Sequence, residues 1–173
     1  FHHNCGNTTL ARILCKELGC GKRDFCEINA AESRGIDDIR SINQRMGLSP
    51  VDGACRIYLL DECHNLTKDA QTALLKPLED TPGHVYFFLC TTDPTKLLPT
   101  LRGRCTEVKL RELTEEELRK VIFEVAEQAG IDLDGEDVHT ALTDASDGSA
   151  RKALVLLHQV IGLGDEASQL EVI

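Results

Sequence analysis

The chain is poor in aromatic residues and has no tryptophan. Phe, Tyr and Trp make up 4% of its 173 residues, and a single methionine occurs. No apolar run approaches the roughly 20 residues that a membrane-spanning helix needs, so we expect a soluble protein without a membrane partner. The first residues, Phe1, His2 and His3, lack a starting Met and do not have the order of a secretory signal. We therefore expect an N-terminally truncated chain that works in the cytoplasm.

Positive charge is also scarce. Lys and Arg number 19 against 29 Asp and Glu, which gives a formal net charge of −10 at pH 7. Because phosphate contacts depend on Lys and Arg, this balance argues against a protein that binds nucleic acid over its whole surface. The imbalance is strongest between Glu112 and Gly148, where the basic residues are Arg119 and Lys120. Contacts with DNA are therefore expected before this segment.

Cysteine is abundant, yet no Cys-x-x-Cys pair occurs. Of the eight cysteines, several lie inside apolar segments, where a reduced thiol behaves as a small hydrophobic group. Structural zinc sites usually use such pairs, so no zinc site is expected from the cluster of Cys15, Cys20 and Cys26. The pattern favours free thiols in a reducing cytoplasm.

Hydrophobic periodicity predicts an α/β fold for the first part of the chain. Helical spacing marks three segments, namely 8–18, 36–42 and 66–78. Apolar runs or alternation mark four strands, namely 25–29, 56–60, 85–90 and 105–110. Pro77 predicts a kink or an early end of the third helix. Since polar residues follow the strands, we expect an open parallel sheet that binds its ligand at the carboxyl ends of the strands.

The second part of the chain has only helical patterns. Thr114 and Glu117 match a capping box, and the apolar stripe that follows ends at Gly130. A second helix is predicted around 138–145 and a third after Ser149. We therefore predict three parts: a core over 1–110, a three-helix domain over 111–165 and the start of a C-terminal region over 166–173.

Two segments point to phosphoryl transfer. Asp61 and Glu62 follow a buried strand directly, where one carboxylate can hold Mg²⁺ and its neighbour can polarise water. The segment 4–12 has the layout of a phosphate-binding loop that opens a helix, and Thr8 stands where a hydroxyl would bind Mg²⁺. An isolated Asp-Glu pair is usually an ordinary acidic loop, but the upstream loop shifts the balance towards a nucleotide site.

Four motifs carry a family resemblance. They are Asp61-Glu62-Cys63-His64, Thr91-Thr92-Asp93-Pro94, Arg102-Gly103-Arg104-Cys105 and Gly148-Ser149-Ala150-Arg151-Lys152-Ala153-Leu154. In order and spacing they resemble the AAA+ clamp-loader ATPases, a group with bacterial gamma/tau subunits, phage clamp loaders and replication factor C small subunits. The segment 27–36 also resembles this group, and the Arg-Cys pair is the most specific match. The resemblance covers nearly the whole chain and implies a P-loop NTPase core followed by a helical lid.

At the ATP site, the resemblance implies Walker B roles for Asp61 and Glu62. Glu62 would activate water, while Asp61 and Thr8 would hold Mg²⁺. Thr92, with Thr91 as the weaker match, would be the sensor 1 residue near the γ-phosphate. The residues expected along the ATP phosphates are Cys5, Gly6, Asn7, Thr8 and Thr9.

The resemblance also implies roles at subunit and DNA contacts. Arg151 matches the sensor 2 arginine of the lid, and Arg104 matches the finger that reaches the ATP of a neighbouring subunit. A fork of guanidinium donors suits the charge spread over phosphate oxygens. Arg34, Thr67 and Lys68 match places where helix N-termini follow DNA phosphates. The implied partners are other clamp-loader subunits, a sliding clamp and primer–template DNA.

The chain departs from the family pattern in two places. The family loop reads Gly-x-x-Gly-x-Gly-Lys-Thr, whereas Phe1, Asn4 and Asn7 stand at the first glycine, the second glycine and the lysine. A neutral Asn cannot supply the cation of lysine. Either these residues do not represent the native loop, or the chain is a non-hydrolysing subunit similar to delta-prime; the intact chemical residues elsewhere favour the first alternative. The second departure is Gly103 in place of the family serine.

The sequence therefore predicts a clamp-loader subunit that couples ATP binding and hydrolysis to loading of a sliding clamp on primer–template DNA. The absence of a zinc module favours the phage or replication factor C branch of the family. The expected location is the cytoplasm of a bacterial or phage-infected cell, or the nucleus if the protein is eukaryotic. A scaffold subunit that contributes only Arg104 is the alternative. A third hypothesis is a branch-migration motor, which the Arg-Cys pair disfavours. His64 is expected to be a coupling or structural residue rather than a base.

Overall fold

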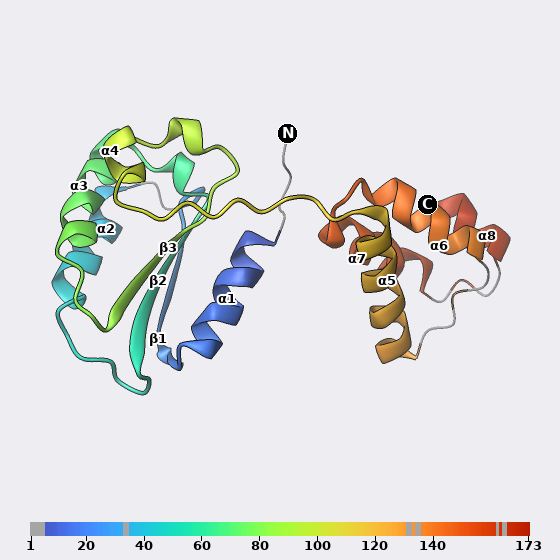
Figure 1. Ribbon diagram of the computed structural model, residues 1–173, viewed down its shortest axis with the longest axis horizontal. Coiled ribbons are helices and arrows are strands. Elements are labelled where there is room, and N and C mark those ends of the chain that lie inside the picture. The colour runs from blue at the N-terminus through green and yellow to red at the C-terminus, as the bar shows by residue number, and fades with distance from the viewer. Residues whose placement is uncertain (1–5, 33–34, 131–132, 134–135, 162, 164–165) are drawn as a thin grey trace. The chain divides into compact units, whose positions relative to one another are not determined.

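The computed structural model describes residues 6–32, 35–130, 133, 136–161, 163 and 166–173. The chain divides into two compact units, one containing Asn7–Lys109 and the other containing Leu110–Ile173 (Figure 1). The first is an α/β unit and the second is helical, so the predicted fold class is confirmed. In the described part of the chain, no helix combines the length and the apolar character needed to cross a membrane.

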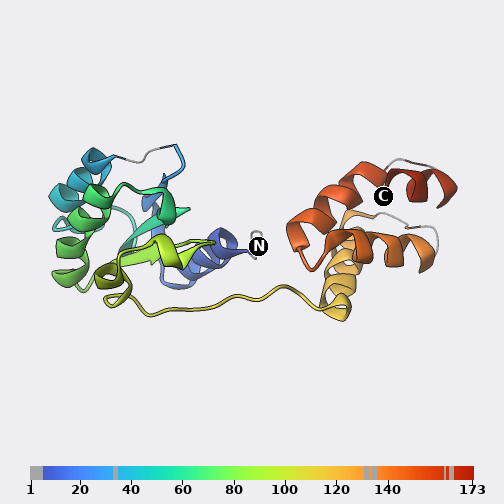
Figure 2. The same cartoon turned by 90° about the horizontal axis from the view of Figure 1, so that it is seen from above.

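The first unit is a parallel sheet with helices on both faces (Figures 1 and 2). Its strands pair in the order β1 (Cys20–Asn29), β2 (Cys55–Asp61) and β3 (Val85–Leu89). Its longer helices are α1 (Asn7–Glu17), α2 (Ile36–Arg45) and α3 (Lys68–Glu79). Short turns of helix complete it: η1 (Cys63–Asn65), η2 (Pro94–Lys96) and α4 (Pro99–Arg102). The figures place α1 on one face of the sheet and α2 with α3 on the other.

Alternation along β2 directs its side chains to these two faces. Tyr58 and Leu60 pack in the larger core, together with residues of α2 and α3. Ile57 packs instead with Cys15 of α1 in a smaller cluster. Asp61 has the same parity as Ile57 and therefore lies on the face that α1 covers. This placement decides which side chains of α1 meet the carboxyl end of β2.

The structure corrects two of the predicted strands. Residues 105–110 form no strand, although their sequence alternates, and Val108 is 70% exposed. Alternation produces a strand only where a neighbouring edge offers hydrogen bonds, and within the described residues the sheet contains three strands, none of them paired with this segment. The first strand begins at Cys20 rather than at residue 25, with an irregular register between Cys20 and Phe25. Pro77 lies in the last turn of α3, which ends at Glu79, so the helix ends soon after the proline.

A buried ion pair fixes the loop between α2 and β2. Asp24 is 1% exposed and accepts hydrogen bonds from the backbone N–H groups of Val51, Asp52 and Gly53. Its Oδ1 atom also accepts from Nη2 of Arg56 at 3.0 Å. The guanidinium group further donates to the carbonyl of Arg45 at the end of α2 and to those of Leu48 and Ser49 in the loop. One carboxylate and one guanidinium group thus satisfy several polar backbone groups of this loop.

A buried glutamine ties α3 to the segment that follows β3. Nε2 of Gln71 donates to the carbonyl of Leu66 at 3.1 Å, and Oε1 accepts from the N–H of Leu98 at 2.9 Å. A longer contact of 3.5 Å joins Nε2 to the carbonyl of Lys96. Both ends of the amide are therefore used. The segment held in this way lies between Thr92 and Arg104 in the chain.

The described part of the second unit has four helices, three of which supply the residues of its buried core. The four helices are α5 (Glu115–Ala129), α6 (Glu136–Ser146), α7 (Ala150–Val160) and α8 (Glu166–Val172). The capping box of Thr114 and Glu117 is present, and Gly130 closes α5 with a φ of 67°. Ser149 caps α7 by accepting from the N–H of Lys152. The residues of α8, where the sequence suggested the start of a further region, contact α6 and α7.

Candidate nucleotide site

The first helix meets the end of the second strand through one hydrogen bond. Gly6, with a φ of 81°, precedes α1, and Thr8 lies in the first turn of this helix. Oγ1 of Thr8 donates to Oδ2 of Asp61 at 2.8 Å. Hydroxyl and carboxylate oxygens are the ligands that Mg²⁺ prefers. The pair therefore fits a Mg²⁺ site at the carboxyl end of the sheet.

Glu62 occupies an unusual backbone conformation beside this pair. Its φ of 50° and ψ of 39° lie in the left-handed region, which is uncommon for glutamate and costs of order 1–3 kcal/mol. The N–H of Glu62 donates to Oδ1 of Asp61 at 3.0 Å. Beyond Glu62, the N–H of Cys63 donates to the carbonyl of Cys90, whose own N–H donates to the carbonyl of Leu60. The surrounding ladder thus holds the strained turn, as is typical of functional sites.

A short polar chain joins Glu62 to the turn after β3. Nδ1 of His64 lies 3.3 Å from Oε2 of Glu62 and 3.0 Å from Oγ1 of Thr91. Oγ1 of Thr92 lies 3.5 Å from the same Oε2 atom, and the N–H of Asp93 donates to Oγ1 of Thr91. A bare Nδ1 would set two lone pairs against each other, so we assign the ring proton to Nδ1. Thr92 thus contacts Glu62 directly, whereas Thr91 reaches it through His64.

A second pair, which the sequence did not indicate, lies on the same face of the sheet. Nη2 of Arg12 contacts both carboxylate oxygens of Glu27, at 3.0 and 2.8 Å. The hydrogen bond and charge of Glu27 raise the pKa of Arg12, and the charge of Asp61 raises it further. The signal was present in the spacing, because Arg12 is four residues after Thr8 on a helix. Its partner could be known only from the register of β1.

The carboxyl end of the sheet is strongly acidic. Burial raises the pKa of the Cys90 thiol to about 11, and the charges of Asp61, Glu62 and Glu27 contribute to this rise. The negative charges of three carboxylates therefore act on the half-buried thiol of Cys90. A triphosphate placed here requires compensating positive charge, which Mg²⁺ and a basic side chain would provide.

Arg104 lies just after α4 and is exposed. Nη1 donates to the carbonyl of Thr100 at 2.9 Å, and Nη2 lies 3.4 Å from Oε2 of Glu79. Gly103 has an ordinary helical φ of −64°, and a Cβ atom there would meet its nearest neighbour, the carbonyl oxygen of Pro99, at 3.4 Å. The backbone therefore does not require glycine at this position, and its substitution for the family serine leaves the loop intact.

The other predicted site residues lie on α1, α3 and α7 or outside the described residues. Arg151 is an exposed residue in the first turn of α7, in the second unit. Thr67 is the N-cap of α3, its hydroxyl accepting from the N–H of Ala70, and Lys68 is the exposed first residue of that helix. Asn7 and Thr9 lie in the first turn of α1. Two predicted residues, Cys5 and Arg34, fall outside the described residues.

Of the three cysteines that cluster in the sequence, Cys15 and Cys20 pack in one cluster and Cys26 does not join them. Phe25 packs in the α1 cluster with Cys15 and Cys20, so Cys26 points to the opposite face of the sheet. Within the ranges that the structure describes, no group of three His, Cys, Asp or Glu side chains is placed to hold a metal ion.

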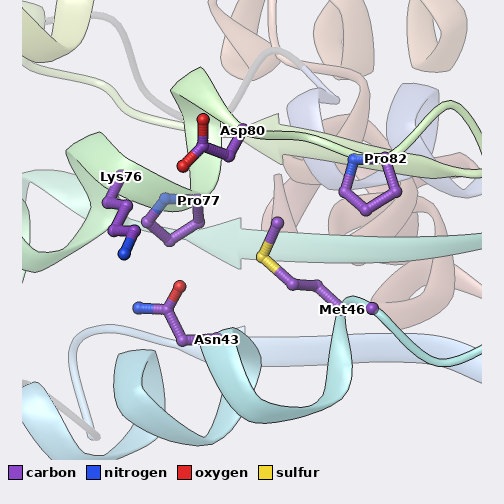
Figure 3. A pocket seen from close by; sticks show the side chains of 7 residues that line it. Asn43, Met46, Lys76, Pro77, Asp80 and Pro82 are labelled. Carbon is purple, nitrogen blue, oxygen red and sulfur yellow. The ribbon is translucent and has the colours of Figure 1, made fainter.

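A groove of about 430 Å³ lies at the other end of the sheet. Figure 3 shows Asn43 and Met46 from the end of α2 facing Lys76, Pro77 and Asp80 from the end of α3. None of the predicted nucleotide residues lines it. The groove is therefore separate from the polar cluster around Asp61.

Comparison with known proteins identifies relatives at the level of sequence. A family model described as "DNA polymerase III, delta subunit" matches residues 2–114. The gamma/tau subunit of DNA polymerase III from Mycobacterium tuberculosis is 32% identical over 180 residues, covering 91% of this chain and 31% of that protein. The tau subunit from Escherichia coli is 34% identical over 181 residues, covering 92% and 28%. The gamma subunit from Buchnera aphidicola is 33% identical over 179 residues, covering 91% and 49%.

Solved structures confirm the fold. The Holliday junction branch migration motor RuvB from Thermotoga maritima superposes with a TM-score of 0.74 at 24% identity, covering 90% of this chain and 50% of that chain. At this identity the likeness shows the fold alone and leaves the activity open. The chain spans half or less of the length of the curated relatives named above. Because the family model covers most of the chain, this protein belongs to the DNA polymerase III delta subunit family, and its predicted kinship with the AAA+ clamp-loader subunits is confirmed.

Proposed function

We propose that this chain forms the ATP-site core of a clamp-loader subunit, which couples ATP binding and hydrolysis to loading of a sliding clamp on primer–template DNA. The observation that carries the proposal is the convergence at one sheet edge of the Thr8–Asp61 pair and the Glu62–Thr92 contact, at 2.8 and 3.5 Å. The gamma/tau relatives are subunits of a bacterial DNA polymerase, which supports a cytoplasmic role in replication with other subunits of that assembly.

The chemistry follows from the placement of oxygen atoms. Thr8 and Asp61 would hold Mg²⁺, which neutralises phosphate charge when bound. Both side-chain contacts of Glu62, from His64 and Thr92, use Oε2. Oε1 is then the oxygen that accepts a proton from the attacking water, and the two contacts fix its direction. Thr92 would also contact the γ-phosphate, as a sensor 1 residue does.

Contacts with partners use residues on the outside of both units. Arg104 serves the ATP of the neighbouring subunit, and its exposure fits a role in trans. Arg151 brings a cation from the lid to the γ-phosphate, so that nucleotide state sets the lid angle. Thr67 and Lys68, at the start of α3, contact phosphates of primer–template DNA.

A non-catalytic scaffold subunit, similar to delta-prime, is the second candidate. Asn7 favours it, because this residue leaves the start of α1 without the family lysine. Such a chain binds no ATP and contributes only Arg104 to its neighbour. Calorimetry with ATP and the effect of Arg104→Ala on a partner's hydrolysis distinguish it from the first candidate.

Repair of the phosphate loop tests the proposed function. In the full-length chain within its assembled complex, Asn4→Gly with Asn7→Lys is expected to tighten ATP binding by about 10- to 100-fold, because a hydrogen bond to a charged group contributes roughly 1.5–3 kcal/mol. DNA-stimulated ATP turnover should rise with it. Adding Thr8→Ala to the repaired chain is the matched control, since it removes the hydroxyl ligand and should reverse the gain in turnover. A repaired chain without ATP binding would contradict the proposal.

His64 offers a second test. His64→Ala is expected to lower single-turnover ATP hydrolysis by about 10- to 100-fold, because loss of positioning at a reacting group has effects of this size. ATP affinity should stay nearly constant, since the side chain of His64 contacts Glu62 and Thr91 and its proposed role is to position Glu62. His64→Asn places an amide nitrogen near the position of Nδ1 and should retain most of the rate. Equal losses in the Asn and Ala variants would rule out this positioning role.

A further inference from the structure

The start of α1 lacks the positive charge that a triphosphate requires. Asn7 stands at the position of the lysine, and the described residues Gly6, Thr8 and Thr9 are also uncharged. Glu27, Asp61 and Glu62 all act on the nearby Cys90 thiol, so the edge is rich in negative charge. Binding of ATP at this edge therefore needs a cation from another part of the chain.

Arg12 is placed to supply it. It lies four residues after Thr8 on α1, so both side chains leave the same face of the helix. Long side chains on a helix lean towards its N-terminus, which directs the guanidinium group back towards the first turn. The side chain is 61% exposed. Lys16, the next basic residue on α1, lies roughly 12 Å further along the axis from Thr8 at about 1.5 Å per residue.

The contacts of Arg12 show that its side chain lies against β1, near enough to Asp61 for this charge to raise the pKa of Arg12. Glu27 pairs with Leu59 in the parallel register. Leu59 is two residues before Asp61 in β2, so the two point to the same face of the sheet. The Arg12–Glu27 pair and the Thr8–Asp61 pair therefore both join α1 to the same face of the sheet, on neighbouring strands. Because exposed ion pairs contribute little to stability, exchange of the Glu27 carboxylate for a phosphate costs little.

We infer that Arg12 supplies the phosphate-binding cation of this chain, in place of the lysine that Asn7 replaces, and that Glu27 holds it until nucleotide binds. The inference rests on the proposed function and names the residue that makes ATP binding compatible with the loop. A guanidinium group suits the task, since its planar fork contacts two phosphate oxygens at once.

The test is a double-mutant cycle on ATP affinity, measured by calorimetry with full-length chain in its assembled complex. Without other changes, R12A is expected to weaken ATP binding by at least about tenfold, as for loss of a charge-assisted hydrogen bond. In the N7K background the same change should weaken binding by less than about threefold, because the lysine then carries the charge. E27Q should leave ATP affinity unchanged or raise it, since it releases Arg12.

A structural role for the ion pair gives a different pattern. In that case R12A and E27Q remove the same contact and weaken binding alike in both backgrounds, which would overturn the inference. If R12A prevents assembly, the double variant R12Q/E27Q keeps a neutral hydrogen-bonded pair and carries the same comparison. If the N7K chain binds ATP tightly and R12A has no effect in either background, the role of Arg12 is refuted and the proposed function is not. Failure of the N7K chain to bind ATP refutes the proposed function itself.

Discussion

Asp24→Asn is expected to lower the free energy of unfolding of the α/β unit by about 3–5 kcal/mol, the usual cost of breaking a buried ion pair by removing one partner. Arg56, which is 8% exposed, then retains a charge with no carboxylate to balance it. The amide of Asn also offers only one acceptor oxygen where three backbone N–H groups and Nη2 of Arg56 now converge. Urea unfolding followed by circular dichroism measures the loss.

Two variants serve as controls for this result. Asp37 forms an ion pair with Arg40, and its side chain is 88% exposed. Asp37→Asn removes this exposed pair and should change stability little. Joint replacement of Asp24 and Arg56 by apolar residues of similar volume should not restore the loss, since the backbone N–H groups of residues 51–53 are then left without their acceptor. A loss in Asp24→Asn no larger than that in Asp37→Asn would contradict the role of the buried pair.

The same carboxylate gives the stability a defined dependence on pH. Burial by itself raises the pKa of Asp24, but hydrogen bonds from Asp52, Val51 and Arg56 outweigh it and hold the pKa well below its usual range. Because the folded state depresses this pKa, its contribution is complete above the ordinary aspartate pKa of about 4 and is lost as pH falls further. The urea midpoint of the unaltered protein should therefore fall below this pH more steeply than that of Asp24→Asn.

The sequence was sufficient where local patterns determine structure. The run before Asp61 is apolar without alternation, and it forms a strand that is buried over Cys55–Leu60. The positions of Asp61 and Glu62 at its carboxyl end followed from that. The capping box of Thr114 and Glu117 was equally local and is present in full. Contacts within one turn or one strand can be read without a fold.

Residues whose roles depend on pairing between segments could not be assigned from the sequence. Asp24 acquires its donors only when the loop before β2 folds over the start of β1. Glu27 meets Arg12 only because the register of β1 sets it on the face of α1. The predicted strand at 105–110 failed for the same reason, since alternation specifies a face but not the partner edge that a strand needs.

Glu62→Gln is expected to lower ATP hydrolysis by about 10²- to 10⁴-fold, the range for loss of a positioned general base. The amide keeps the size of the side chain and can still contact Thr92 and His64, so ATP affinity should be nearly unchanged. Rapid-quench measurement of single-turnover hydrolysis, with nucleotide binding measured separately, tests both statements. Glu17→Gln, which makes the same change at the exposed end of α1, is the matched control and should have no effect. Turnover that survives in Glu62→Gln would rule out hydrolysis at this site.

The backbone of Glu62 separates its chemical role from a structural one. Because its φ of 50° is strained for any residue with a Cβ atom, Glu62→Gly should raise the free energy of unfolding, or leave it unchanged, with a gain of up to about 1 kcal/mol. The same variant should lose hydrolysis as completely as Glu62→Gln. A residue kept for stability alone would show the reverse, with stability lost in the glycine variant. Increased stability together with lost turnover is the result expected if the strain at Glu62 is retained for catalysis.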